Sequence, residues 1–163
     1  MSVRAVLALG SNLGDRKKTI KSAIRAIKAI DGVAVVAKSP LVESHALTEG
    51  GLDDSKPNYL NGVVEIETAL KPGDLLDELQ KIELDHGRIR IERWGSRTLD
   101  IDIITYGNLI KAGKRLELPH PRAFSRSFVV VPWALMNPSA ILPGHGKVAE
   151  LAEPLKHEVW ISA

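Results

Sequence analysis

The chain contains no cysteine, which excludes disulfide bonds, thiolate catalysis and zinc sites built on thiolates. Aromatic residues make up only 4% of it. Long apolar runs are missing as well: the two longest, residues 3–9 and 128–136, fall well short of the roughly 20 residues that a membrane span needs. With no signal peptide visible, we expect a cytoplasmic protein with no membrane partner.

A marked excess of charge of one sign is also absent, since 22 Lys and Arg stand against 20 Asp and Glu and give a net charge of +2. A general nucleic-acid binder would usually be more lopsided, so no nucleic-acid partner is expected. With 163 residues, 44% of them hydrophobic, the chain is long enough for one proper core and too short for two comfortable ones. We therefore expect a single domain over residues 1–163, acting as a monomer.

The densest chemistry lies in residues 83–106. From Leu99 to Ile103 the residues alternate between apolar and acidic, which predicts a strand with Asp100 and Asp102 on one face. Strand geometry places these two side chains about 7 Å apart, so the carboxylates could hold one or two cations between them and would repel each other without one. Because cysteine is absent, the ligands would be oxygens, which favour Mg²⁺.

Four arginines precede this strand closely, at positions 88, 90, 93 and 97. Taken alone, the two aspartates are better explained as the solvated face of an amphipathic strand, and the arginines could be their salt-bridge partners. Four arginines against two aspartates, however, leave an excess suited to a polyanion, because guanidinium groups bind phosphate through paired hydrogen bonds. A magnesium site facing an arginine loop is the constellation that phosphoryl-type transfer needs.

The hydrophobic pattern predicts an α+β fold. Strand, helix, strand, strand, helix and strand follow one another, which is the βαββαβ order of a ferredoxin-like core with helices packed on an antiparallel sheet. The second strand is expected to return antiparallel to the first. The predicted core strands are 3–9, 33–38, 59–67 and 100–106, and the core helices are 15–30 and 72–86.

A C-terminal extension of short elements follows the core. We expect an edge strand at 116–118, helices at 127–136 and 148–155, and a last strand at 159–161. Within the core, residues 44–57 form a loop rich in Gly, Asp and Ser that is too long for a simple connector.

The segment between the first strand and the first helix, Gly10 to Gly14, invites a phosphate-loop interpretation. It lacks the lysine and hydroxyl residue that complete a Walker motif. An N-cap formed by Ser11 or Asn12 is a sufficient explanation.

Several single residues carry a weaker signal. Tyr59 and Asn61 alternate onto the same face of their strand. Trp94 lies in the most polar stretch, where an aromatic ring more plausibly stacks on a ligand than anchors the core. His120, between two prolines, is either a structural hydrogen-bonding residue or a phosphate contact. The remaining histidines, at 45, 86, 145 and 157, show no metal-ligand spacing and receive no role.

Taken in order, these residues resemble the 6-hydroxymethyl-7,8-dihydropterin pyrophosphokinase family of folate biosynthesis, over nearly the whole chain. The third of four matching segments is the most specific, because an arginine-tryptophan loop runs directly into the two-aspartate strand. The segments are LGSNLGD at 9–15, NYLNGVVEIET at 58–68, ERWGSRTLDIDI at 92–103 and LPHPR at 118–122.

The resemblance implies an enzyme that transfers the β,γ-diphosphate of ATP to the hydroxymethyl oxygen of the pterin and releases AMP. It implies two Mg²⁺ ions on Asp100 and Asp102, and catalytic roles for Arg88 and Arg97. The implied ATP-binding residues are Leu76, Gln80, Glu83, Arg90, Trp94, Arg97, Ile103, Arg115, His120 and Arg126. The implied pterin-binding residues are Ser44, Leu47, Tyr59, Asn61, Trp94, Asp100 and Phe128.

Some residues depart from the family pattern. Residues 44–47 read Ser-His-Ala-Leu where threonine and prolines are common, and Glu117 stands where a hydroxyl residue can contact the nucleotide. The stretch 88–94 is one residue shorter than in some relatives, which puts the contact through Arg90 in doubt.

Two other functions fit parts of the pattern. A metal-dependent nucleotidyltransferase or cyclase would also use paired aspartates on a ferredoxin-like core, but it gives no reason for Tyr59, Asn61 and Phe128. A non-enzymatic RNA-binding module would need exposed aromatics and a basic face, and without metal the acidic strand would repel phosphate.

Overall fold

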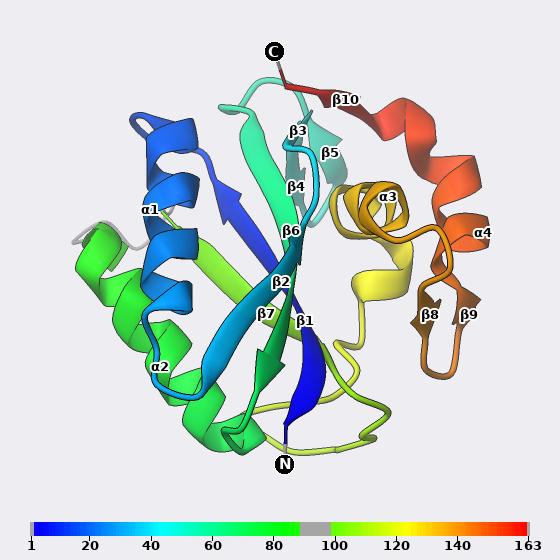
Figure 1. The fold of residues 1–163 in the computed structure, drawn as a ribbon. Helices are drawn as coiled ribbons and strands as arrows, with labels where there is room; N and C mark the ends of the chain where they lie inside the picture. Colours follow the sequence, from blue (N-terminus) through cyan, green and yellow to red (C-terminus); the bar gives the residue numbers. More distant parts are fainter. Residues whose placement is uncertain (1, 89–98, 163) are drawn as a thin grey trace.

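The computed structural model describes residues 2–88 and 99–162, and a six-stranded antiparallel sheet forms its centre (Figure 1). The strands run in the order β10-β3-β6-β1-β7, and β2 pairs with the same edge of β6 as β3 does. The six strands are β1 (Val3–Ser11), β2 (Val33–Lys38), β3 (Val42–Ser44), β6 (Tyr59–Thr68), β7 (Asp100–Tyr106) and β10 (Val159–Ile161).

Four α-helices, two small hairpins and three shorter turns complete the described elements; the turns are Leu84–Arg88, Ala123–Ser125 and Glu153–Glu158. The helices are α1 (Arg16–Lys28), α2 (Pro72–Glu83), α3 (Ser127–Met136) and α4 (Val148–Ala152), and the hairpins pair β4 (Ala46–Thr48) with β5 (Gly51–Asp53) and β8 (Ile141–Leu142) with β9 (Gly146–Lys147). Within the two described ranges, no helix combines the length and apolar character needed to cross a bilayer.

The predicted ferredoxin-like core is confirmed: β1, α1, β2, β6, α2 and β7 follow in the βαββαβ order. The expected direction of the second strand was wrong. β2 pairs with β6 and not with β1, and because β1 is also antiparallel to β6, β1 and β2 run in the same direction. The reason is the crossover helix α1, which returns the chain to the starting edge of the sheet so that the next strand repeats the first strand's direction.

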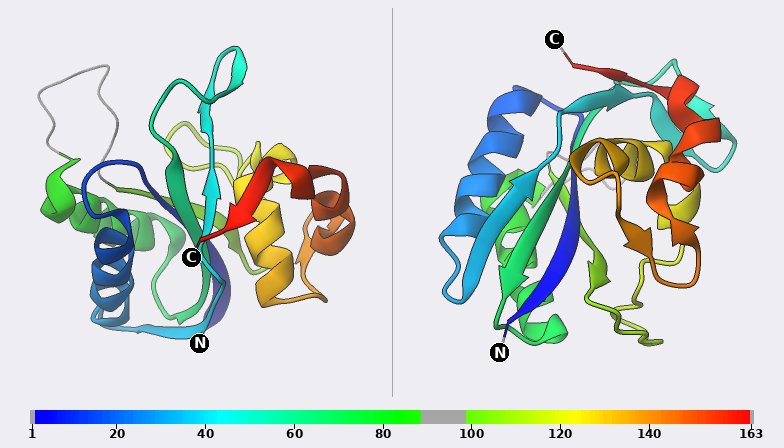
Figure 2. Two further views of the ribbon diagram at one scale, coloured as in Figure 1. Left: turned by 90° about the horizontal axis from the view of Figure 1, so that it is seen from above. Right: turned by 45° about the vertical axis from the view of Figure 1, so that its right-hand side comes forward.

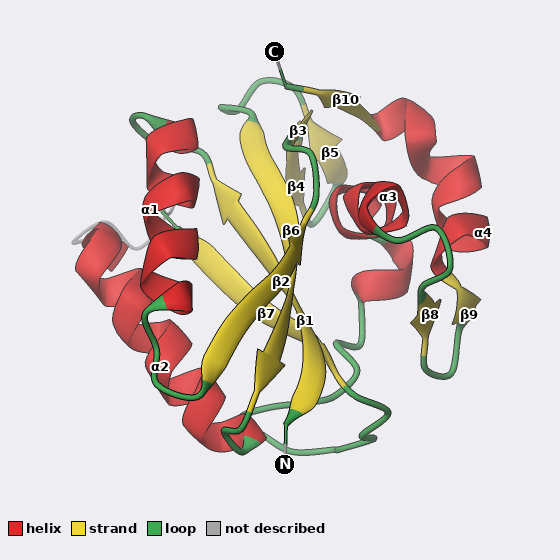
Figure 3. Ribbon diagram, in the orientation of Figure 1, coloured by secondary structure: helices red, strands yellow, loops and turns green. Residues whose placement is uncertain are grey.

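One face of the sheet is covered by α1 and α2 (Figures 1 and 3). The apolar positions of α1 recur at helical spacing, and Ile20, Ala23 and Ile27 are fully buried. They pack in one cluster with Leu75 and Leu79 of α2 and with alternate residues of the central strands. The helical spacing of these apolar residues therefore predicts correctly which face of α1 is buried.

The opposite face is covered only in part, by α3 and the elements that follow it (Figure 2). Val6 of β1, Val63 of β6 and Ile104 of β7 pack there against the apolar residues of α3. α3 is buried along Val129, Val130 and Val131, so it forms the centre of a second core. Beyond this core, toward Gly10 of β1, the same face opens into a cavity, and the candidate site lies there.

Two expectations for irregular segments need correction. Residues 44–57 do not form a plain loop, because β4 and β5 pair as a hairpin in which Thr48 Oγ1 donates to Gly51 O at 2.9 Å and Gly51 has φ +103°. The helix expected at 148–155 ends at Ala152 and continues as a 3-10 turn over Glu153–Glu158. Pro154 lacks the N–H that an α-helical ladder needs, which explains the break.

The C-terminal extension otherwise follows the sequence pattern. α3 and β10 occur at the predicted positions. The edge strand expected at 116–118 is reduced to an isolated bridge between Lys111 and Leu118.

The N-terminal cap of α1 is Asp15, whose carboxylate accepts a hydrogen bond from the Lys18 backbone N–H at 3.1 Å. The sequence-based choice of Ser11 or Asn12 was wrong. Ser11 is the last residue of β1 and is fully buried, so the strand runs longer than its apolar stretch suggests and the helix begins later.

Replacing Asp15 by alanine should lower the free energy of unfolding by about 1 kcal/mol, because it leaves a backbone N–H of the first turn without its partner. Urea denaturation followed by circular dichroism measures this change. Asp31→Ala is the matched control: it removes an exposed aspartate beyond the other end of α1, where a negative charge gains nothing from the helix dipole. Equal loss of stability in both variants would contradict a capping role for Asp15.

Candidate functional site

The site is built where three central strands lie side by side. Gly10 of β1 pairs with Asn61 of β6 on one side and with Asp100 of β7 on the other, and Ala8 pairs with Asp102. Because side chains alternate along a strand, these positions face the same side of the sheet as the second core. Small residues of β1 thus lie between the amide of β6 and the two carboxylates of β7.

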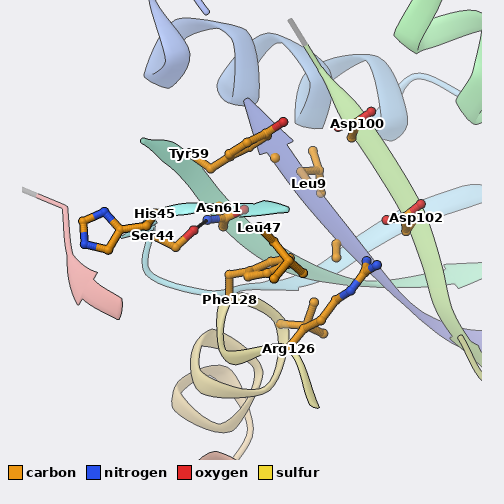
Figure 4. Close-up of a pocket in the computed structure, with 13 residues that line it drawn as sticks. Leu9, Ser44, His45, Leu47, Tyr59, Asn61, Asp100, Asp102, Arg126 and Phe128 are labelled. Carbon is orange, nitrogen blue, oxygen red and sulfur yellow. Dashed lines mark hydrogen bonds between the residues drawn. The ribbon is translucent and has the colours of Figure 1, made fainter. Parts of the chain in front are cut away.

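A cavity of about 180 Å³ opens over this surface (Figure 4). The rings of Tyr59 and Phe128 lie on two of its sides, and Asn61 is buried below them. Asn61 Nδ2 donates to Ser44 Oγ at 2.8 Å, which fixes the amide and leaves its oxygen available as an acceptor. The lining residues are Ala8, Leu9, Gly10, Ser44, His45, Leu47, Tyr59, Asn61, Asp100, Asp102, Arg126, Phe128 and Val129.

All six predicted pterin-side residues within the described part of the chain line this one cavity, although they come from five different elements, β3, β4, β6, β7 and α3. Arg126, predicted on the nucleotide side, lines it too, with its guanidinium carbon 5.8 Å from the centre of the Phe128 ring. This cation–π geometry orients the ring and the charge together. The cavity combines planar apolar walls, an amide and both signs of charge.

A second cavity, of about 290 Å³, adjoins the first through Asp102, which lines both. Of the predicted nucleotide-side residues, Leu76, Ile103, Arg115 and His120 line it. Arg115 is held by an ion pair with Asp77 and donates to Gln80 Oε1 at 3.2 Å. Gln80 therefore supports the wall through Arg115 and does not itself line either cavity.

The two carboxylates differ in environment, since Asp100 is half-buried and Asp102 is exposed. Within residues 2–88 and 99–162, no three Asp, Glu or His side chains come together as a metal-binding group. A cation here would take two ligands from the protein and the rest from a ligand or water. That donor set fits Mg²⁺, which binds through one or two carboxylates plus substrate phosphates.

His120 is fixed beside Asp102 at the edge of β7. Its backbone N–H donates to Ile104 O at 2.8 Å, and its Nδ1 accepts from the Arg122 N–H at 3.2 Å. Burial lowers the pKa of His120 below its ordinary value, and the charges of Arg126 and Arg122 lower it further, against the opposing effect of Asp102. A neutral imidazole with its proton on Nε2, and so able to donate a hydrogen bond from that atom, follows from both observations.

Glu83, predicted to bind ATP, is buried at the end of α2. Its Oε2 accepts a hydrogen bond from Ile101 N at 2.8 Å, and Ile101 lies between the two aspartates. Among the described residues that line the two cavities, Glu83 does not appear. In this position the carboxylate fixes the strand that presents Asp100 and Asp102.

The chain leaves α2 through a kinked turn, Leu84–Arg88, in which His86 and Gly87 have non-helical backbone angles, and the turn ends at the predicted catalytic Arg88. His86 fastens this turn: Nδ1 donates to Ile82 O at 2.7 Å, and Nε2 lies 2.9 Å from Ser22 Oγ of α1. Gly87 has φ +88°, a conformation that favours glycine. The predicted Arg90, Trp94 and Arg97 lie outside the described residues.

Five residues of the first cavity were missed by the sequence analysis: Ala8, Leu9, Gly10, His45 and Val129. Ala8 and Gly10 alternate along β1, so extending that strand to Ser11 would have placed both on the site face. His45 received no role because it matches no metal-ligand spacing, yet it lines the cavity. No local signal identifies it.

The βαββαβ order, with helices packed on an antiparallel sheet, defines a ferredoxin-like domain, and Asp102 lines two adjoining cavities on it. The family model described as 7,8-dihydro-6-hydroxymethylpterin-pyrophosphokinase matches residues 6–138. The chain belongs to this family.

The relatives agree with this assignment. The chain is 41% identical over 151 residues to the 2-amino-4-hydroxy-6-hydroxymethyldihydropteridine pyrophosphokinase of Haemophilus influenzae, covering 93% of this chain and 92% of that protein. The protein of the same name from Pseudomonas aeruginosa is 42% identical, with 93% and 91% covered.

Among solved structures, Plasmodium falciparum HPPK-DHPS A437G/K540E with pterin and p-hydroxybenzoate matches with a TM-score of 0.74 at 14% identity. The match covers 99% of this chain and 47% of that one, so the chain spans about half of the Plasmodium protein. At this identity the likeness supports the fold.

Gly10→Ala tests the floor of the first cavity. An added Cβ would lie 3.1 Å from Asn61 Oδ1 and 3.6 Å from Tyr59 Cδ2, so the amide must shift, which strains its hydrogen bond to Ser44 Oγ. We expect a shift of the Asn61 side-chain signals in ¹H–¹⁵N NMR spectra and a loss of about 0.5–1.5 kcal/mol of unfolding free energy, the usual contribution of one hydrogen bond.

Gly73→Ala is the matched control, because an added Cβ there has no atom within 4 Å and Gly73 lies in the first turn of α2. It should leave the Asn61 signals in place. Unshifted Asn61 signals in Gly10→Ala would show that the floor tolerates a larger residue and would contradict this packing argument.

Proposed function

We propose that this chain transfers the β,γ-diphosphate of ATP to the hydroxymethyl oxygen of 6-hydroxymethyl-7,8-dihydropterin and releases AMP, as a step of folate synthesis. The observation that carries the proposal is that Asp102 lines both cavities, the first with aromatic rings on its sides and the second with arginine in its wall. The chain that carries these cavities belongs to the pyrophosphokinase family. A reaction between two bound substrates requires such a meeting point.

The first cavity suits the pterin. A fused heteroaromatic ring would stack between Tyr59 and Phe128, as flat π-systems do. Asn61, held by its hydrogen bond to Ser44, and the backbone near Ser44 and Leu47 would read the polar edge of the ring. The hydroxymethyl group would then point toward Asp100 and Asp102, which line the same cavity.

The second cavity suits ATP. Apolar Leu76 and Ile103 would pack on the base, and Arg115, steadied by Asp77, would supply positive charge. His120 would donate its Nε2 hydrogen to a phosphate or ribose oxygen. Arg126 lines the first cavity and would contact a phosphate from there. Gln80 would support the nucleotide side through Arg115, and Glu83 would support it through Ile101.

Asp100 and Asp102 would hold two Mg²⁺ ions, the number that the family resemblance implies. When bound, the ions would neutralise the phosphate charge and polarise the transferring group. Glu83 keeps the two carboxylates in place through Ile101 N. Arg88 and Arg97 are proposed as the catalytic arginines that stabilise the diphosphoryl group as it loosens, with Arg90 and Trp94 as further contacts.

In the proposed step the pterin oxygen bonds to the β-phosphorus, and the bond from that phosphorus to the oxygen bridging the α-phosphorus breaks. AMP leaves with the bridging oxygen, and the hydroxyl proton is released. The protein's part is to align the attacking oxygen and the leaving oxygen on opposite sides of the phosphorus, which the two adjoining cavities support.

Product analysis tests the proposal directly. The chain is mixed with ATP, Mg²⁺ and 6-hydroxymethyl-7,8-dihydropterin, and the products are separated by ion-exchange chromatography and identified by ³¹P NMR. AMP formed one-for-one with a pterin diphosphate is expected. ADP would instead indicate single phosphoryl transfer, and pyrophosphate would indicate a nucleotidyltransferase, which the family match does not favour.

Asp100→Asn and Asp102→Asn should each lower kcat by about 10²-fold or more. Each replaces a carboxylate that would hold Mg²⁺ with a neutral amide, and the charge of the ion stabilises the transition state. The melting temperature should stay the same or rise, since one of two neighbouring like charges is lost. Glu150→Gln on α4 is a charge-matched control remote from both cavities, and its kcat should match that of the wild type. Unfolding of both aspartate variants would indicate a structural role instead.

A further inference from the structure

His45 connects the first cavity to the C-terminal strand. It lies between the end of β3 and the start of β4 and lines the cavity. In Figure 4 its ring points away from the cavity. It packs instead on Trp160 of β10, with ring centres 5.2 Å apart and ring planes tilted by 60°.

The same ring is tied to the strand that carries Tyr59. His45 Nδ1 lies 3.1 Å from Asn58 Oδ1, and because an amide oxygen only accepts, Nδ1 carries the proton. Asn58 precedes Tyr59 directly, and its own carbonyl accepts from Arg16 Nη1 at 3.0 Å. Arg16 also forms an ion pair with Glu43 of β3 at 3.0 Å. These contacts join the residue before β6 to β3 and to the residue before β4.

β10 is firmly placed beside this network. Trp160 is opposite Glu43 in the pairing of β10 with β3, and Ser162 N donates to Leu41 O at 2.9 Å. The β4–β5 hairpin, in contrast, has little core of its own: of residues 46–53 only Ala46 is buried, and Leu47 and Leu52 are 48% and 38% exposed. A segment with so few buried contacts takes its position from its anchors.

We propose that Trp160 and His45 are positioning residues for the pterin: the C-terminal strand holds the His45 ring, and the ring holds the Ser44–Leu47 wall against the strand of Tyr59 and Asn61. This inference rests on the proposed function. Neither side chain touches the reacting atoms, so loss of the contact should weaken pterin binding and leave ATP binding and the chemical step in place.

Steady-state kinetics at saturating ATP and Mg²⁺ test this proposal with two variants. Trp160→Ala removes the ring under His45, and His45→Phe keeps a ring against Trp160 but removes the donor to Asn58. Each should raise the KM for the pterin about three- to tenfold, the effect of one lost packing contact or hydrogen bond. The ATP dissociation constant and kcat should change less than about twofold.

Trp160→Phe restores an aromatic ring and should bring the pterin KM back toward the wild-type value, which a general loss of stability would not do. Ile161→Ala is the matched control, because Ile161 is the next residue of the same strand and is 59% exposed. It should leave the pterin KM unchanged.

The outcomes separate this inference from the proposed function. If the wild-type chain forms no AMP from ATP and the pterin, the proposed function fails and this inference with it. If the wild type is active and both variants keep its pterin KM, the proposed function stands and this inference is overturned. A parallel rise in the KM for pterin and in the dissociation constant for ATP would also overturn it, because the effect would then be general.

Discussion

The site depends on the backbone pairing of one strand with its two neighbours. Gly10 of β1 is opposite Asn61 on one side and opposite Asp100 on the other, and this register alone brings an amide and a carboxylate face together. On that face each central strand carries a cavity residue two positions from a residue of the second core. The pairs are Ala8 and Val6 in β1, Asn61 and Val63 in β6, and Asp102 and Ile104 in β7. α3 covers the apolar half and leaves the polar half open.

The parts of this arrangement that follow from alternation were predictable from the sequence. A period of two placed Asp100 with Asp102 and Tyr59 with Asn61, and a period near 3.6 residues identified α1 and α2. The element order then led to the ferredoxin-like core. Phe128 could be assigned to the same cavity only through the family resemblance, because it lies on a helix that packs on the sheet from another part of the chain.

What the sequence could not supply was set by distant contacts. Asp15 and Asn12 are both acceptable caps, and the choice depends on where β1 ends, which the pairing of Ser11 with Leu60 decides. The partner of β2 depends on the path of the crossover, and the hairpin at residues 46–53 carries too few apolar residues to signal its strands. His45 acquires its place from Trp160, which is 115 positions away in the sequence.

The small buried surface of the β4–β5 hairpin has an evolutionary consequence. Mutations at its exposed positions remove few packed contacts, so they should change the free energy of unfolding little. Mutations at Gly10 or Asn61 disturb strands that belong to the core sheet. Sequence drift within such a site should therefore concentrate on the hairpin side, and an inhibitor designed to distinguish this chain from its relatives would gain selectivity by reaching toward the hairpin.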